Sequence, residues 1–294
     1  MSLNQKIIFI SSLLSLNLSY GCTTVFWNDN TQAKVVARTV DLFIPDMPKI
    51  IVYPRGIERN GETGTNTLKW TSKYGNVVVS EFNSPAISDG INEHGLTAHL
   101  LYLTGSNYGK VKGETPTLSN LMWAQYLLDN YKTVDEVIRA TDTFQLMPTV
   151  VHNQTWPVHL SIQDATGDAA VIEFINGKKI VYHGSQYTVM TNEPAYNIQL
   201  SNLKRYQTFG GKLPLPGDSD PLSRFVRVST YLKTLPVPLD LRETIAGIFS
   251  VIRTAMVPFG AVDTSGNKTE DAWATRWASV AGPDHECLVI NPIM

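Results

Sequence analysis

Cys22 is the residue of this 294-residue chain whose position most directly suggests chemistry. It follows a segment, residues 1–21, in which a single basic residue precedes an apolar run and then small residues. That order is typical of a secretory signal peptide, and the small side chains of Ser19 and Gly21 fit the −3 and −1 positions of its cleavage site. Removal of residues 1–21 would make Cys22 the first residue of the mature chain.

Three interpretations of Cys22 compete. It could be the lipid attachment site of an exported lipoprotein, but such sites normally have Leu at −3 and a small residue at −2, where this chain has Ser19 and Tyr20. It could be an ordinary buried or bridged cysteine, since the chain has one other cysteine, Cys287, and so allows one disulfide at most. It could also be an N-terminal nucleophile, whose thiol attacks while its own α-amine, with a pKa of about 8, acts as general base.

Composition excludes several classes of function. With 43% hydrophobic residues the chain has material for a large core, in which we expect its six tryptophans, and it is not a disordered or fibrous protein. The net charge is −2, so the chain lacks the excess of basic residues that binding of a nucleic acid would require. The six histidines show no ligand spacing, so we expect neither a metal nor a cofactor. After residue 21 no window approaches the roughly 18 apolar residues of a membrane helix, and we expect no stable membrane insertion.

Strand and helix patterns come in blocks along the chain. Runs of β-branched and aromatic residues predict strands at 22–27, 34–39, 50–53, 76–79, 86–91, 95–103, 159–163, 169–174, 179–181, 187–191, 274–280 and 286–290. Helical spacing and capping residues predict helices at 117–130, 133–141, 222–233 and 241–254. Because strands and helices do not alternate one by one, the fold class is α+β, with antiparallel sheets and segregated helices. Cys22 would then begin a strand.

Four sequence blocks resemble one known family. Cys22-Thr-Thr followed by Ala37-Arg-Thr-Val-Asp41 looks like the opening of the choloylglycine hydrolase and penicillin V acylase family of N-terminal-nucleophile amidases. The other blocks, in the same order as in the family, are Asp89-Gly-Ile-Asn-Glu-His-Gly-Leu96 with Leu100-Leu-Tyr-Leu103, Val189-Met-Thr-Asn-Glu-Pro194 and Leu222-Ser-Arg-Phe-Val-Arg227. The resemblance implies an αββα four-layer sandwich of two antiparallel sheets flanked by helices, formed as a single domain by residues 22–294.

The resemblance and general chemistry together imply roles for two residues near the start of the mature chain. Thiolate is the attacking form of cysteine, and a cation such as Arg38 would lower the pKa of the Cys22 thiol. Without the motif, Arg38 would be interpreted as a solvated residue of an edge strand. Asp41 would accept hydrogen bonds from the α-amine of Cys22 and hold it against the thiol, whereas an Asp after a strand is otherwise most often a turn residue.

Three later residues match the family positions that support the transition state. Asn192 would donate its side-chain amide to the oxyanion, although an Asn before Glu-Pro is also ordinary turn chemistry. The second oxyanion donor in the family comes from the position of Tyr102, which penicillin acylases fill with Tyr and bile salt hydrolases with Asn. Arg224 could be a snorkelling surface residue, but the family match implies a cation that supports Cys22 or the transition state.

We therefore expect an exported cysteine amidase, periplasmic or secreted, that cleaves linear non-peptide amides through a thioester. The block around Tyr102 resembles the penicillin V acylase branch, which also takes acyl-homoserine lactones, and conjugated bile acids are the third candidate substrate. The alternative is a non-catalytic exported binding lipoprotein anchored through Cys22. A small-molecule amide is the implied partner, and the resemblance leaves open the homotetramer that relatives commonly form.

Two departures from the family pattern affect these expectations. Family members continue with additional strands after the motif that Thr275-Arg-Trp277 resembles, whereas this chain stops at Met294, so we expect a shortened C-terminus. Leu42 and Phe43 stand where many members carry a Trp after the Asp. A different residue there predicts a different substrate preference.

Overall fold

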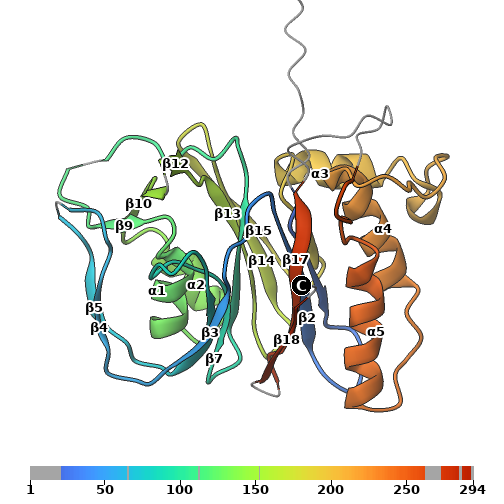
Figure 1. Ribbon diagram of the computed structural model, residues 1–294, viewed down its shortest axis with the longest axis horizontal. Coiled ribbons are helices and arrows are strands. Elements are labelled where there is room, and N and C mark those ends of the chain that lie inside the picture. Colours follow the sequence, from blue (N-terminus) through green and yellow to red (C-terminus); the bar gives the residue numbers. More distant parts are fainter. Residues whose placement is uncertain are drawn as a thin grey trace, which may run out of the picture.

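The computed structural model describes residues 21–64, 66–111, 113–151, 153–261, 273–284 and 287–292. In this part of the chain two antiparallel sheets pack face to face, and helices cover both outer faces (Figure 1). This arrangement confirms the αββα sandwich expected from the sequence. The predicted signal peptide, apart from Gly21, and the terminal Met294 lie outside the described residues.

A five-stranded sheet carries the segment that begins with Cys22. Its strands, in spatial order, are β16 (Val189–Thr191), β1 (Thr23–Trp27), β2 (Val35–Leu42), β17 (Ala274–Gly282) and β18 (Cys287–Pro292). All eight residues of the central strand β2 are buried, which agrees with the apolar side chains on both of its faces. β1 pairs with β2 so that Thr24 lies opposite Arg38. Arg38 therefore projects from the middle of the sheet, and its interpretation as a solvated residue of an edge strand is wrong.

A seven-stranded sheet forms the other inner layer. Its strands, in spatial order, are β15 (Lys178–His183), β14 (Ala169–Ile175), β13 (Val158–Gln163), β8 (Thr97–Tyr102), β7 (Ile87–Asn92), β6 (Asn76–Ser80) and β3 (Lys49–Tyr53). The turn between β7 and β8 is fixed by Asn92, whose Oδ1 accepts hydrogen bonds from the backbone N–H groups of His94 and Leu96. Gly95 in this turn has a φ of 78°, which glycine adopts without strain. The hairpin aligns β8, whose far end reaches the candidate site.

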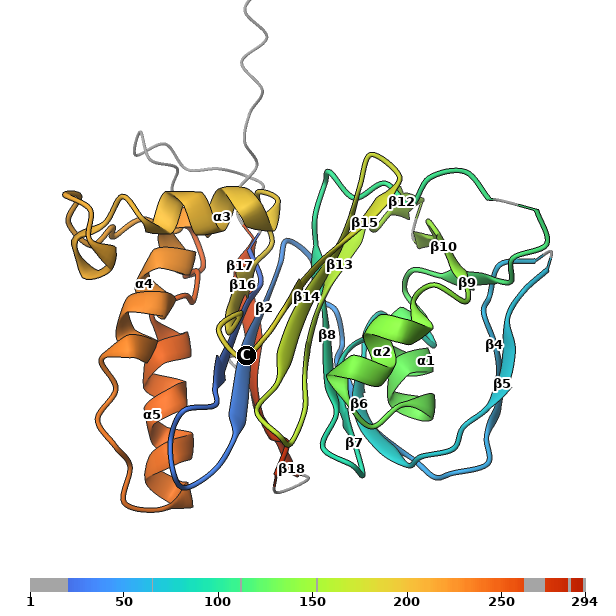
Figure 2. The same ribbon diagram turned by 180° about the vertical axis from the view of Figure 1, so that it is seen from behind.

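Helices close the sandwich on both sides (Figures 1 and 2). α1 (Trp123–Asn130) and α2 (Val134–Ala140) cover the seven-stranded sheet, and α4 (Pro221–Lys233) and α5 (Leu241–Arg253) cover the five-stranded sheet. α3 (Tyr196–Leu203) follows β16 and packs against α4. The side chains of Thr133 and Asp240 accept hydrogen bonds from the first turns of α2 and α5, which satisfies donors that have no partner inside the helix.

The sequence prediction differs from the structure mainly in the short elements. The helix predicted over 117–130 begins only at Trp123, because Thr117–Ser119 form a short strand, β9. The backbone N–H of Ser119 donates to the carbonyl of Gly61, which lies far away in sequence. This N–H is therefore not available for a hydrogen bond within a helix. α3 was not predicted, nor were the remaining short elements, which carry too few residues to show a period. These are β4 (Glu58–Asn60), β5 (Lys69–Thr71), β10 (Gln145–Met147), β11 (Val150–Val151), β12 (Gln154–Thr155) and the 3₁₀ turn η1 (Gln207–Phe209).

Two large apolar clusters hold the layers together. One lies between the sheets and under α4 and α5, and it includes Cys22, Phe225 and Trp277. The other lies between the seven-stranded sheet and α1, and it includes Trp123 and Leu127. Cys22 is thus fixed by a close-packed core rather than carried on a loop. None of the helices in the described ranges has the length and apolar character that crossing a membrane requires.

Candidate active site

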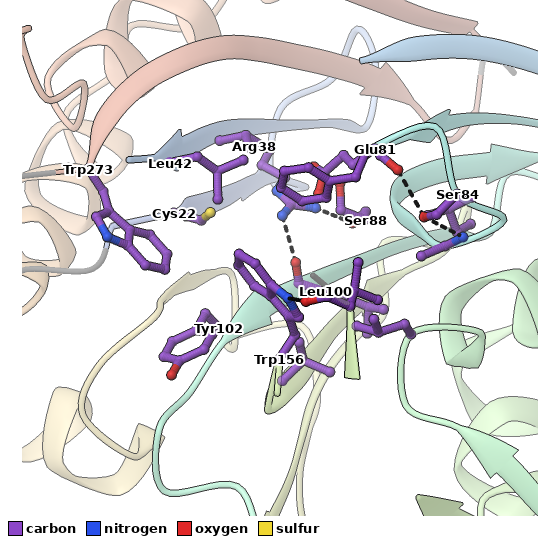
Figure 3. A pocket seen from close by; sticks show the side chains of 17 residues that line it. Cys22, Arg38, Leu42, Glu81, Ser84, Ser88, Leu100, Tyr102, Trp156 and Trp273 are labelled. Atoms are coloured by element: carbon purple, nitrogen blue, oxygen red, sulfur yellow. Dashed lines mark hydrogen bonds between the residues drawn. The ribbon is translucent and has the colours of Figure 1, made fainter. Parts of the chain in front are cut away.

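Cys22 stands just before β1 and lines a pocket between the two sheets (Figure 3). The pocket holds about 620 Å³ of empty space, counted out to its open mouth. Most of its lining is apolar or aromatic and includes Leu42, Phe82, Leu100, Tyr102, Trp156 and Trp273. The rings of Trp156 and Trp273 lie 6.3 Å apart, and that of Phe82 lies 5.6 Å from Trp156. A flat or extended apolar group would therefore find contacts on several sides, next to the thiol.

Arg38 bridges the two sheets beside Cys22. Its side chain extends from β2 towards the opposite sheet and donates to two backbone carbonyls there. Nη1 donates to Ser88, and Nη2 donates to Leu100 at 2.6 Å (Figure 3). Within the described residues no carboxylate pairs directly with this buried cation. Its positive charge is therefore not neutralised at contact distance, and it lowers the pKa of the Cys22 thiol, as expected from the sequence.

Burial acts on the thiol more strongly than Arg38 does. Desolvation raises the pKa of Cys22 to about 11, against the opposing effects of the Arg38 guanidinium and of the Asp41 backbone N–H. In the chain as described Cys22 is still joined to Gly21, so its nitrogen is an amide and cannot act as a base. The thiol of this uncleaved form is consequently protonated at neutral pH.

Asp41, Arg224 and Thr275 form a buried cluster behind Cys22. Arg224 Nη1 lies 2.8 Å from Asp41 Oδ2, and Thr275 Oγ1 donates to Asp41 Oδ1 at 2.5 Å. Both members of the ion pair are fully buried, so the interpretation of Arg224 as a snorkelling surface residue is wrong. Burial raises the pKa of Asp41 to about 7, although Arg224 and Thr275 act in the opposite direction.

The same arginine contacts the residue that precedes Cys22. Arg224 Nη1 donates to the carbonyl oxygen of Gly21 at 2.7 Å, and a Cβ at position 21 would collide with the guanidinium group. A residue larger than glycine would thus displace Arg224 from Asp41. Glycine at position 21 thus has a structural reason in this chain, besides the signal cleavage expected from the sequence.

Asn192 reaches the site from the end of β16. Thr191 pairs with Thr23, and the backbone N–H of Asn192 donates to the carbonyl of Cys22 at 3.3 Å. The Asn192 side chain is fully buried, yet neither Oδ1 nor Nδ2 has a hydrogen-bond partner in the described part of the chain. A buried amide without partners is costly, and a catalytic role is one explanation for such a group in a native structure.

Tyr102 lies at the end of β8 on the opposite side of the pocket. Its ring is half-buried and lies 5.6 Å from that of Trp273. The carboxylate of Glu193, next to Asn192, accepts a hydrogen bond from the backbone N–H of Thr104 at 2.6 Å. This bond joins the segment that carries Asn192 to the segment that carries Tyr102, the two positions expected to supply oxyanion donors.

Five of the six predicted site residues lie around the start of β1: Cys22, Arg38, Asp41, Asn192 and Arg224. The sixth, Tyr102, lines the opposite side of the same pocket. Sequence reasoning missed Glu81 and Ser88 on the pocket lining, and it assigned Trp156 and Trp273 to the core alone. Nothing in their local sequence indicated a pocket. Thr275, which holds Asp41, stands in the last family motif and could have been found from it.

One cluster within the described ranges has the composition of a metal site. Asp135, Asp168 and His183 bring their ligand atoms within 4.8 Å of one another. His183 and Asp135 are exposed, and none of the three lines the pocket. The 2.7 Å pair between His183 Nε2 and Asp168 Oδ2 accounts for the cluster as a surface interaction.

The family model of linear amide C–N hydrolases, choloylglycine hydrolase family, matches residues 22–282. The chain belongs to the choloylglycine hydrolase family. Its four layers are accordingly those of the N-terminal-nucleophile hydrolase fold. A structure of penicillin V acylase from Agrobacterium tumefaciens superposes on it with a TM-score of 0.82 at 37% sequence identity, covering 92% of this chain and 83% of that one.

Two curated proteins are also similar over most of the chain. The penicillin V acylase of Pectobacterium atrosepticum is 35% identical over an alignment of 306 positions, which covers 94% of this chain and 80% of the relative. The bile salt hydrolase/transferase of Clostridium perfringens is 26% identical over 283 residues, which cover 85% and 83%.

Proposed function

We propose that this chain is an exported cysteine amidase that cleaves linear non-peptide amides through a thioester on Cys22. One observation carries the proposal: Arg38, Asp41, Asn192 and Arg224 converge on a cysteine that lines an apolar pocket and begins the family match. The proposal requires removal of residues 1–21, so that the nitrogen of Cys22 becomes an amine, and it places the mature protein in the periplasm or outside the cell.

The first half of the reaction forms the thioester. The α-amine of Cys22 takes the thiol proton, and the sulfur attacks the amide carbon of the substrate. Arg38 stabilises the thiolate, and Asp41 holds the protonated amine. Nδ2 of Asn192 donates to the oxyanion, together with a second donor from the Tyr102 segment. The carbon–nitrogen bond then breaks, and the amine portion leaves with the proton that the α-ammonium group returns to it.

The second half releases the acyl portion. The α-amine, again neutral, takes a proton from a water molecule, which attacks the thioester carbon. The same donors stabilise the second oxyanion. When the carbon–sulfur bond breaks, the carboxylic acid leaves and the thiol of Cys22 is restored.

The pocket lining favours an aromatic or long apolar acyl group. Phe82, Trp156 and Trp273 present three rings to it, and Leu42 stands where many family members carry a Trp. The similar proteins from Pectobacterium atrosepticum and Agrobacterium tumefaciens are both named penicillin V acylases. We therefore place penicillin V-like amides first among the substrates, before acyl-homoserine lactones and conjugated bile acids.

A substrate panel combined with intact-mass measurement tests the proposal. Penicillin V, glyco- and tauro-conjugated bile acids and acyl-homoserine lactones are incubated side by side with the exported protein and with Cys22→Ala. We expect hydrolysis of at least one class by the exported protein, none by the variant, and an acyl adduct on Cys22 after rapid acid quenching. Activity that survives in Cys22→Ala would contradict the proposal.

The same mass measurement distinguishes the alternative function. A binding lipoprotein anchored through Cys22 would carry diacylglycerol on that residue, and acylation of its amine would remove the base. The proposal instead predicts an unmodified mature chain that starts at Cys22.

A further inference from the structure

Glu81 places a carboxyl group on the lining of an otherwise largely apolar pocket. It follows β6 in the loop to β7, and Arg38 is the other charged residue that lines the pocket. The loop is fixed by its own hydrogen bonds, since the carbonyl of Glu81 accepts from both the backbone N–H and the hydroxyl of Ser84. The position of Glu81 is therefore defined before any substrate binds.

The carboxyl group of Glu81 has acceptor capacity to spare. Ser88, which also lines the pocket, donates its hydroxyl to Oε1. A carboxylate offers about four acceptor positions. In the described part of the chain no other side chain or backbone group donates to the carboxyl group of Glu81, and Arg38 directs its guanidinium nitrogens to the carbonyls of Ser88 and Leu100. A bound molecule is thus the available source of a further hydrogen bond.

The charged groups around Glu81 fix how it would act on a bound group. Burial raises its pKa to about 7, with Asp46 and Asp89 acting in the same direction and Arg38 in the opposite one. Above that pH the carboxylate dominates, and it accepts hydrogen bonds but repels a second carboxylate. An acyl group that covers Glu81 without donating to it would leave this acceptor unpaired, which costs binding free energy.

We propose that, among the aromatic or long apolar acyl groups that the lining favours, Glu81 makes the pocket prefer those that carry a hydroxyl donor and disfavour those that carry a carboxylate. This proposal rests on the amidase function above, because it assigns the pocket to the acyl portion of the substrate. It also separates the roles of the two charged residues on the lining. Arg38 stabilises the thiolate, whereas Glu81, whose charge raises the pKa of the thiol, acts in this proposal on the substrate.

The test compares acyl groups that differ by one substituent. The probes are p-nitroanilides of phenylacetic acid and of its ortho, meta and para hydroxyl and carboxyl derivatives, assayed at pH 8 with mature wild type, Glu81→Leu and Glu81→Gln. Since a hydrogen bond to a charged group contributes about 1.5–3 kcal/mol, wild type should prefer at least one hydroxyl isomer over the parent by about tenfold in kcat/KM. Glu81→Leu should lose this preference, and both variants should gain about tenfold on a carboxyl isomer.

A glutamate outside the pocket provides the matched control. Glu58 is exposed on β4 and does not line the pocket, so Glu58→Leu should keep all wild-type ratios. If the ratios of hydroxyl and carboxyl isomers to parent are the same in wild type and in both Glu81 variants, the selectivity role of Glu81 is refuted while the amidase function stands. If wild type hydrolyses no anilide and forms no acyl adduct on Cys22, the amidase function itself is contradicted.

Discussion

Replacing Asn192 by alanine tests whether its buried amide serves the reaction or the fold. In the described structure neither Oδ1 nor Nδ2 has a hydrogen-bond partner, and the side chain is fully buried. Loss of one oxyanion donor typically lowers kcat by about 10² to 10³, which corresponds to about 2.7–4 kcal/mol of transition-state stabilisation. We therefore expect kcat to fall at least about a hundredfold in Asn192→Ala, with little change in KM.

The same substitution should change the stability only slightly, because two effects of opposite sign act at this position. Removal of an unpaired buried amide relieves a desolvation penalty of about 1–3 kcal/mol. The void left by the missing atoms, roughly 30–40 Å³, costs about 1 kcal/mol. A residual of about 1 kcal/mol would move the Tm of a chain of this size by about 2–4 °C.

Initial rates over a range of substrate concentrations, together with thermal unfolding, provide the assay. Asn202→Ala is the matched control, since Asn202 is a buried asparagine on α3 that does not line the pocket, and its kcat should equal that of wild type. A fall in Tm of more than about 10 °C with kcat retained would refute the reasoning and assign Asn192 to the fold.

Three further predictions concern the groups around the thiol. A mature form with one extra residue before Cys22 should be almost inactive although its thiol is intact, because an amide nitrogen is not a base near pH 7. Arg38→Met should slow alkylation of Cys22 by iodoacetamide at neutral pH, since loss of the cation raises the pKa of the thiol. In the form that still carries residues 1–21, burial raises the pKa of Asp41 from 3.8 to about 7, so between these values that folded chain binds a proton that the unfolded chain releases. This carboxyl therefore lowers the free energy of unfolding as pH rises through that window, and Asp41→Asn should flatten that part of the stability profile.

Each of these predictions has an outcome that contradicts it. Full activity of the extended form would show that a residue other than the α-amine serves as base. An unchanged alkylation rate in Arg38→Met would mean that the cation does not act on the thiol. A stability profile of Asp41→Asn that still declines between pH 4 and pH 7 as steeply as that of wild type would show that Asp41 is already ionised at pH 4 in the folded chain.

The long strands and helices were predictable because their signals are local. A hydrophobic period or a capping residue is visible within a window of about ten residues, and α4 and α5 begin within one residue of their predicted starts. The strand at Thr117–Ser119 was not predictable, since its pairing depends on Gly61 and on β10, which lie far away in sequence. Leu118, its one apolar residue, fits a helix equally well.

The candidate site was predictable in its residues but not in its energetics. The family resemblance selected Arg38 and gave the direction of its effect on the thiol. It could not show that desolvation outweighs that effect, because the burial of Cys22 is created by both sheets and not by its sequence neighbours. Glu81 was not predicted as a site residue for a similar reason. A glutamate after a strand is common, and its contact with Ser88 and its place on the pocket lining depend on the folded structure.

The site is divided between the two sheets, which contribute to it unequally. Cys22, Arg38 and Asn192 belong to the five-stranded sheet or to the segments that begin or leave it. Much of the surface that a substrate would touch, including Glu81 and Leu100, belongs to the seven-stranded sheet or its loops. The β6–β7 loop can therefore change sequence without displacing the sulfur or its supporting groups. Under the proposed function, the same reactive groups can therefore act on different acyl groups when residues on the loops of the opposite sheet change.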